Sequence, residues 1–102
     1  MEEKRECCHT TKTKERTEKE YKDLIHRLNR IEGLVRGIKK MVESDTYCTD
    51  ILIQVSAVNA ALNSFSKVLL GNHIRTCVAE DIRQGKEETV EELVATLQKL
   101  MK

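Results

Sequence analysis

The chain has 102 residues, a length that fits one domain with a single core. Charged residues make up 34% and aromatic residues 3%, and neither Trp nor Pro occurs, a composition typical of helical proteins. The formal net charge is +1, and no apolar run approaches the roughly 20 residues that cross a bilayer, which excludes a membrane span. Four Cys without a secretory leader predict reduced thiols in a cytoplasmic protein rather than a disulfide scaffold.

The charge is unevenly distributed along the chain. Residues 1–40 hold 12 Lys or Arg against 8 Asp or Glu, whereas residues 41–102 hold 6 against 9. Between positions 22 and 40 there are two acidic residues and six basic ones: Lys22, Arg27, Arg30, Arg36, Lys39 and Lys40. Such a stripe is either a solvated helix face or a phosphate-binding surface, and an oligomer would sum several copies of it.

Residues 1–17 are polar, mixed in charge and without apolar periodicity, so we predict a flexible N-terminal arm there and a helical domain over 18–102. Apolar residues recur at steps of three and four from Tyr21 to Val42, which predicts an amphipathic first helix beginning near Thr17. The segment 44–46 (Ser-Asp-Thr) ends this helix, and so short a connection makes the next helix an antiparallel neighbour.

The second predicted helix starts near Cys48. Gly71 and Asn72 interrupt its pattern, but we expect it to continue to Gly85, which is the better C-terminal stop. A helix of about 37 residues is about 55 Å long, and its apolar positions need partners beyond one protomer. A third, shorter helix is predicted over about 87–100. The predicted fold class is therefore all-α, a three-helix protomer with long antiparallel helices that oligomerises.

Cys48, His73 and Cys77 supply two thiolates and one imidazole, which together suit a soft metal ion. His73 and Cys77 are four residues apart and project from one face of a helix. Cys48 lies 25 residues before His73, about 37 Å along a single helix, so one ion cannot span them. Either the helix breaks and folds back, or a second chain supplies the missing thiolate. An antiparallel pair of helices would place Cys48 of one chain beside His73 and Cys77 of the other.

Three ligands without a fourth favour a low-coordinate Cu(I) ion, because structural zinc normally has four protein ligands. A plainer interpretation exists for each residue alone, since a single Cys or a His–Cys pair on an apolar face is often only packed. Cys7, Cys8 and His9 also carry soft ligands, and we interpret them as an incidental or auxiliary thiol cluster. No nucleophile elbow or Gly-rich phosphate loop occurs, so we do not expect an enzyme. No helix-turn-helix motif is recognisable either.

Residues 26–82 resemble the copper-sensing operon repressor (CsoR/RcnR) family of bacterial metal-sensing transcriptional repressors. The resemblance extends from about Tyr21 to Lys99 and is most specific in RLNRIEGLVRGI, in the YC pair with the following DILIQVSAV, and in the H-x-x-x-C pair. It implies a homotetramer, a dimer of antiparallel dimers. Its copper branch carries Cys, His and Cys at the sensing positions, which matches Cys48, His73 and Cys77, whereas the nickel/cobalt, persulfide and formaldehyde branches differ there.

The resemblance implies a repressor that binds operator DNA when metal-free and is released on Cu(I) binding, so that copper-resistance or efflux genes are derepressed. Tyr47 matches the Tyr beside the first ligand. Glu92 resembles the family's Glu that communicates with the ligand His, with Glu91 as the alternative. The residues expected to contact DNA are all basic: Arg27, Arg30, Arg36, Lys39, Lys40, Lys67 and Arg75.

Two alternative functions stay open at this point. The same scaffold would act as a thiol or persulfide sensor if an oxidant or persulfide crosslinked Cys48 and Cys77. A cytosolic copper buffer or chaperone without a DNA role would show no salt-sensitive, sequence-selective duplex binding.

Overall fold

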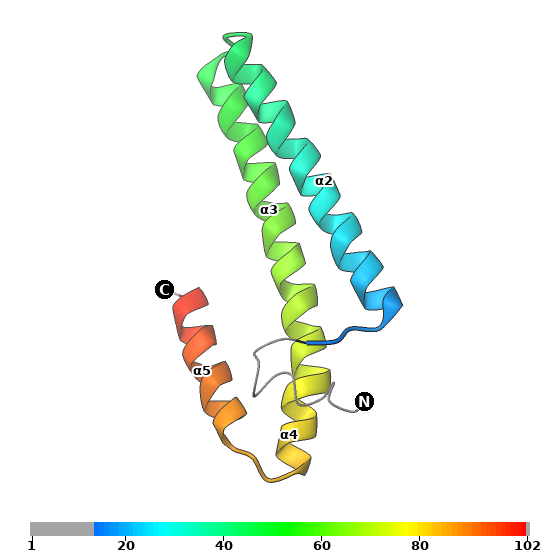
Figure 1. Ribbon diagram of the computed structural model, residues 1–102. Helices are drawn as coiled ribbons and strands as arrows, with labels where there is room; N and C mark the ends of the chain where they lie inside the picture. The colour runs from blue at the N-terminus through cyan, green and yellow to red at the C-terminus, as the bar shows by residue number, and fades with distance from the viewer. Residues whose placement is uncertain (1–13, 102) are drawn as a thin grey trace. The chain divides into compact units, whose positions relative to one another are not determined.

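A computed structural model describes residues 14–101, and all the regular secondary structure in this range is helical. Its elements are α2 (Glu18–Glu43), α3 (Cys48–His73), the π-helical turn η1 (Ile74–Val78), α4 (Ala79–Arg83) and α5 (Glu88–Leu100), as Figure 1 shows. The all-α prediction with long helices is confirmed. Described residues 16–69 form one compact unit, and residues 14–15 with 70–101 form a second. The predicted arm over 1–17 lies outside the described residues except for 14–17, and its flexibility stays a prediction.

Both ends of α2 follow local signals in the sequence. The Thr17 hydroxyl accepts a hydrogen bond from the Glu20 N–H at 3.1 Å, so Thr17 is the N-cap and the helix begins where predicted. At the other end Asp45 adopts a left-handed backbone with φ of 58°. The Asp45 N–H then reaches the Val42 carbonyl at 3.1 Å, and the Thr46 N–H reaches the Met41 carbonyl at 2.9 Å, which closes the helix and reverses the chain.

Within the first unit α2 and α3 run antiparallel on either side of this turn (Figure 1), as the short connection predicted. Leu24 and Ile31 of α2 and Val58 of α3 are its buried apolar side chains. Arg27 Nη1 also donates a hydrogen bond to Ser64 Oγ at 3.1 Å, which ties the two helices together. Many other large apolar side chains on these helices stay exposed: Tyr21, Ile25, Leu28, Val35, Val42, Leu52, Ile53 and Leu62.

The helix that begins as α3 does not break at Gly71. His73, Val78 and Ala79 all have right-handed helical φ and ψ, so α3, η1 and α4 form an uninterrupted helical stretch. The Ala79 N–H bonds to the Ile74 carbonyl five residues back, which widens the helix at η1. The predicted continuation is therefore confirmed, whereas the π-helical turn inside it was not predicted.

Gly85 ends this stretch as predicted. Its φ of +80° is a left-handed conformation that disfavours residues with a Cβ. The Gly85 N–H bonds to the Ile82 carbonyl at 3.0 Å, and the Lys86 N–H bonds to the Asp81 carbonyl at 2.9 Å. The chain then turns into α5, whose first residue lies one position after the predicted start. No helix in the described part of the chain combines the length and hydropathy of a membrane-spanning segment.

Candidate metal centre and nucleic-acid surface

His73 and Cys77 lie on the same helical stretch, at the point where it changes its hydrogen-bond register. His73 is the last residue of α3, and Cys77 lies within η1; both side chains are half-buried. The spacing of four therefore brings them to neighbouring turns, as predicted. Single π-helical turns inside α-helices occur frequently at functional sites, so η1 is a candidate functional segment.

The electrostatic surroundings of His73 favour the uncharged imidazole. Burial lowers the pKa of His73 below its usual value, and the positive charge of Lys14 lowers it further. The carboxylates of Glu92 and Asp81 oppose this by raising the pKa, but the net direction is downward. A metal-binding imidazole must be neutral, so this environment suits a ligand.

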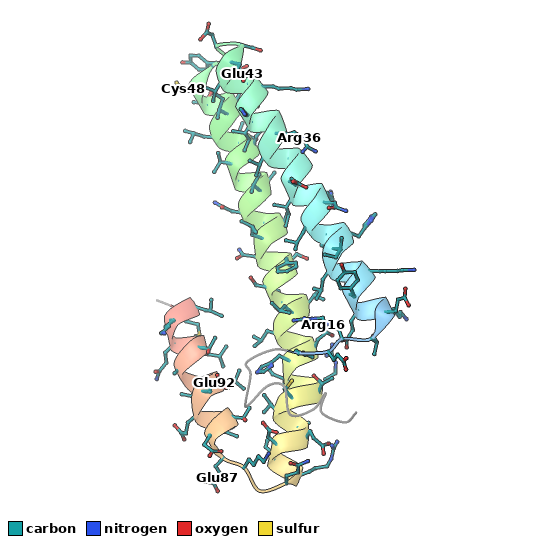
Figure 2. The ribbon with its side chains drawn as sticks, in the orientation of Figure 1. Arg16, Arg36, Glu43, Cys48, Glu87 and Glu92 are labelled. Atoms are coloured by element: carbon teal, nitrogen blue, oxygen red, sulfur yellow. The ribbon has the colours of Figure 1, made fainter. Side chains whose placement is uncertain are left out.

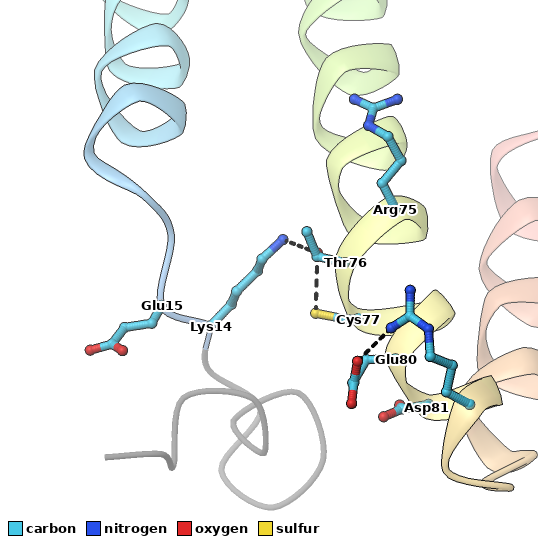
Figure 3. A pocket seen from close by; sticks show the side chains of 8 residues that line it. Lys14, Glu15, Arg75, Thr76, Cys77, Glu80 and Asp81 are labelled. Carbon is cyan, nitrogen blue, oxygen red and sulfur yellow. Dashed lines mark hydrogen bonds and ion pairs between the residues drawn. The ribbon is translucent and has the colours of Figure 1, made fainter.

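Cys77 is bordered by a short chain of polar contacts, drawn in Figure 3. Lys14 Nζ donates a hydrogen bond to Thr76 Oγ1 at 2.8 Å, and Thr76 Oγ1 lies 3.8 Å from Cys77 Sγ. The Thr76 hydroxyl also bonds to the Asn72 carbonyl at 2.7 Å, one turn back. These groups border a cavity of about 330 Å³, lined by Lys14, Glu15, Arg75, Thr76, Cys77, Glu80, Asp81 and Arg83.

Cys48 stands at the other end of α3, where it is the first helical residue and lies by the α2–α3 turn (Figure 2). Its thiol is free and exposed, and the preceding Tyr47 is also exposed. Because α3 runs unbroken from Cys48 to His73, about 37 Å of helix separates them. The first of the two predicted routes to a shared ion requires the helix to break and fold back, and α3 shows no such break. In residues 14–101, no three His, Cys, Asp or Glu side chains of one chain form a group suited to a metal ion.

Two carboxylates influence the His73 imidazole, and one of them is a predicted acidic neighbour. The charge of Glu92 raises the pKa of His73. Asp81 acts on it as well, and sequence reasoning missed this residue. A signal was available, since 73, 77 and 81 continue one step of four along the same helical stretch.

The basic candidates differ in how available they are. Arg30, Arg36, Lys39, Lys40 and Lys67 are exposed, and Figure 2 shows Arg36 projecting from α2. Arg27 is half-buried and bonds to both Asp23, at 3.2 Å, and Ser64. The exposed Arg75 donates to Asn72 Oδ1 at 3.1 Å. Arg27 therefore has a structural role that would complicate any test of it as a DNA contact.

Comparison with known proteins identifies the family. Residues 20–99 match the model of the metal-sensitive transcriptional repressors, so the chain belongs to this family of repressors, which are not enzymes. The chain is 46% identical over 88 residues to the copper-sensing transcriptional repressor CsoR of Bacillus subtilis, covering 85% of this chain and 87% of that protein. The copper-sensing repressor RicR of Mycobacterium tuberculosis is 49% identical over 59 residues, covering 58% of this chain and 62% of that one.

A solved structure also matches the fold. The crystal structure of the copper-sensing repressor CsoR with Cu(I) from Geobacillus thermodenitrificans superposes with a TM-score of 0.83 at 44% sequence identity. The match covers 88% of this chain and 95% of that one. The resemblance stated from the sequence motifs is therefore confirmed at the level of family and fold.

Proposed function

We propose that this chain is a copper(I)-responsive transcriptional repressor that binds operator DNA when metal-free and releases it on binding Cu(I). Derepression of copper-resistance or copper-efflux genes would follow. The observation that carries the proposal is the placement of the soft ligands, with an exposed thiol at one end of α3 and a His–Cys pair at the other end. Relatives that cover most of the chain are copper-sensing repressors, which favours copper over other soft metals.

The proposed ligands are Cys48 of one chain and His73 and Cys77 of another. Two sulfurs and one neutral imidazole suit Cu(I), which accepts low coordination numbers and soft donors. When bound, the ion supplies a soft positive centre for ligands from two chains. His73 meets this requirement through its lowered pKa, and Cys48 through its exposure and free thiol.

A second copy of the chain would bury the exposed apolar side chains of α2 and α3. Their exposed apolar residues include Leu52 and Ile53, each more than 60% exposed, whereas only three apolar side chains of this unit are buried. Burial of such side chains contributes about 25 cal/mol per Å², which favours association. An antiparallel dimer, paired again into a homotetramer, would combine this burial with the cross-chain ligand set.

Two further residues complete the proposed site. Glu92 of α5 holds the orientation of the His73 ring, since a ligand imidazole usually gives its second N–H to an oxygen partner. The effect of the Glu92 charge on His73 supports this assignment. Tyr47 precedes the Cys48 ligand and borders the site from the thiol side.

The proposed DNA surface consists of the exposed basic residues of α2 together with Lys67 and Arg75. Contacts of this kind go mainly to phosphates, so they position the protein, and DNA shape adds to the specificity. When the ligands of two chains converge on one ion, these surfaces shift relative to each other and operator affinity falls. By linkage, the operator-bound protein must bind Cu(I) more weakly by the same factor. A repressor of this kind acts in the cytoplasm.

The test is an anaerobic titration of operator DNA with reduced protein, with and without Cu(I). Operator fragments are first selected from genomic DNA by the metal-free protein. The wild type should lose operator affinity with one Cu(I) per chain, whereas Cys48→Ala should stay bound. A thiol or persulfide sensor would instead respond to oxidant and not to Cu(I). A copper buffer would bind Cu(I) tightly and show no sequence-selective, salt-sensitive affinity for DNA at any stage.

A further inference from the structure

Two of the most buried side chains in residues 14–101 are polar, and they contact each other. Asp81 of α4 is 4% exposed and Thr89 of α5 is 2% exposed, and Thr89 Oγ1 donates a hydrogen bond to Asp81 Oδ2. No other polar side chain in this range is buried to the same degree. A carboxylate out of water is costly unless it is hydrogen-bonded, so the contact is a specific feature of the fold.

Asp81 fixes the start of α5 through its backbone as well as its side chain. Its carbonyl accepts the Gln84 N–H at 3.1 Å and the Lys86 N–H at 2.9 Å, which are bonds of the turn that leads to α5. Thr89 lies three residues before Glu92, so the two share a face of α5. The Asp81–Thr89 bond therefore holds in place the helix face that carries Glu92.

The same residue is connected to the sensing residues by the helix itself. Asp81 follows Cys77 by one turn and His73 by two, with no break in the helical stretch between them. Both Asp81 and Glu92 act on the His73 imidazole, one from its own helical stretch and one from α5. A displacement of the π-helical turn would thus reach Asp81 along the helix before it reached α5.

We propose that the hydrogen bond between Asp81 and Thr89 couples the π-helical turn η1, which contains Cys77, to α5. This inference rests on the proposed Cu(I) site. Both are positioning residues, and neither is a metal ligand or a DNA contact. When His73 and Cys77 move toward Cys48 of a second chain, Asp81 moves with their helix and displaces Thr89 and α5. This hydrogen bond sets the factor by which Cu(I) binding lowers the operator affinity. It contributes little to the affinity for Cu(I) alone or for DNA alone.

The test compares Thr89→Val, which keeps the shape but removes the donor, with Thr89→Ser, which keeps the hydroxyl. For each protein the Cu(I) affinity is measured by chelator competition, and the operator affinity is measured with and without Cu(I). Thr89→Val should retain Cu(I) affinity and metal-free operator affinity. Its copper-induced loss of operator affinity should be about 2- to 30-fold smaller than in the wild type, and Thr89→Ser should restore it.

The outcomes separate this inference from the proposed function. A wild type that copper does not release from DNA overturns both, whereas a Thr89→Val protein released as fully as the wild type overturns only the coupling role. Amide hydrogen exchange in the wild type covers the case in which Thr89→Val fails to fold. Adding Cu(I) should change exchange in residues 84–92, and unchanged exchange there contradicts the inference.

Discussion

The proposed cross-chain site makes a specific prediction about mixing two inactive chains. One chain carries Cys48→Ala, and the other carries His73→Ala together with Cys77→Ala. Neither chain alone can complete the ligand set, whether the ligands come from one chain or from two copies of it. In a mixed dimer, however, the second chain gives its Cys48 to the first chain's His73 and Cys77, which restores one of the two sites.

The size of the recovery follows from the helix and from pairing statistics. About 37 Å of α3 separates Cys48 from His73, so the restored site must span two chains. Random pairing yields mixed dimers for half of the population, and each mixed dimer has one complete site of two. The mixture should therefore hold roughly a quarter of the Cu(I) sites of the wild type.

The assay is a titration of Cu(I) against a competing chelator under anaerobic, reducing conditions, after the chains are mixed by unfolding and refolding. A Cys7→Ser, Cys8→Ser background removes the other two thiols of the sequence. Each mutant chain alone is the matched control and should show no tight site. If differently tagged chains are shown to pair and still bind no Cu(I) tightly, the cross-chain geometry is refuted.

Further predictions concern the metal site, two glycines and the basic surface of α2. His73→Ala should keep much of the Cu(I) affinity through the two thiolates but lose most of the copper-induced fall in operator affinity. In typical allosteric proteins such a fall is about 5- to 150-fold. If copper released this variant from DNA as readily as the wild type, the proposed role of His73 would be contradicted. Gly85→Ala should destabilise the fold by about 1–2 kcal/mol, because its φ is +80°. Gly33→Ala should stabilise α2 by up to about 1 kcal/mol, because there is open space around the added Cβ. Denaturant melts at equal protein concentration measure the change in the free energy of unfolding for both glycine variants. Lys39→Ala with Lys40→Ala should weaken binding to all duplexes and make the dependence of log K on log salt shallower by about one per lost phosphate contact, whereas Lys99→Ala on α5 should leave the slope unchanged.

Most of the fold was predictable because its boundaries are set by short-range chemistry. A Thr before an amphipathic run caps α2, and a left-handed Asp45 closes it within one turn. Gly85 ends the long helical stretch for the same kind of reason, since the left-handed conformation it adopts disfavours a side chain. In each case two or three neighbouring residues decide the outcome, and these can be read directly from the sequence.

The features that were not predictable are the hydrogen-bond register within the long helix and a buried polar contact, and the spacing of apolar residues indicates neither. The π-helical turn shifts the hydrogen-bond register by one residue, which the spacing of the apolar residues in the sequence did not indicate. The Asp81–Thr89 contact requires a carboxylate in a buried position, against the usual preference of Asp for the surface. The His73–Cys77 spacing was recognised in the sequence, whereas Asp81, at the next step of four, was overlooked although its charge also acts on His73.

The length of α3 has a consequence for how two proposed sites in one dimer would interact. Antiparallel pairing puts Cys48 of each chain beside the other chain's His73, so the two sites lie at opposite ends of the paired helices, about 37 Å apart. Charges in water are screened beyond about 8 Å at physiological salt, so binding at one site exerts little Coulombic force on the other. Any cooperativity between the sites must therefore travel through packing, along α3 and through the apolar contacts that pair the two chains.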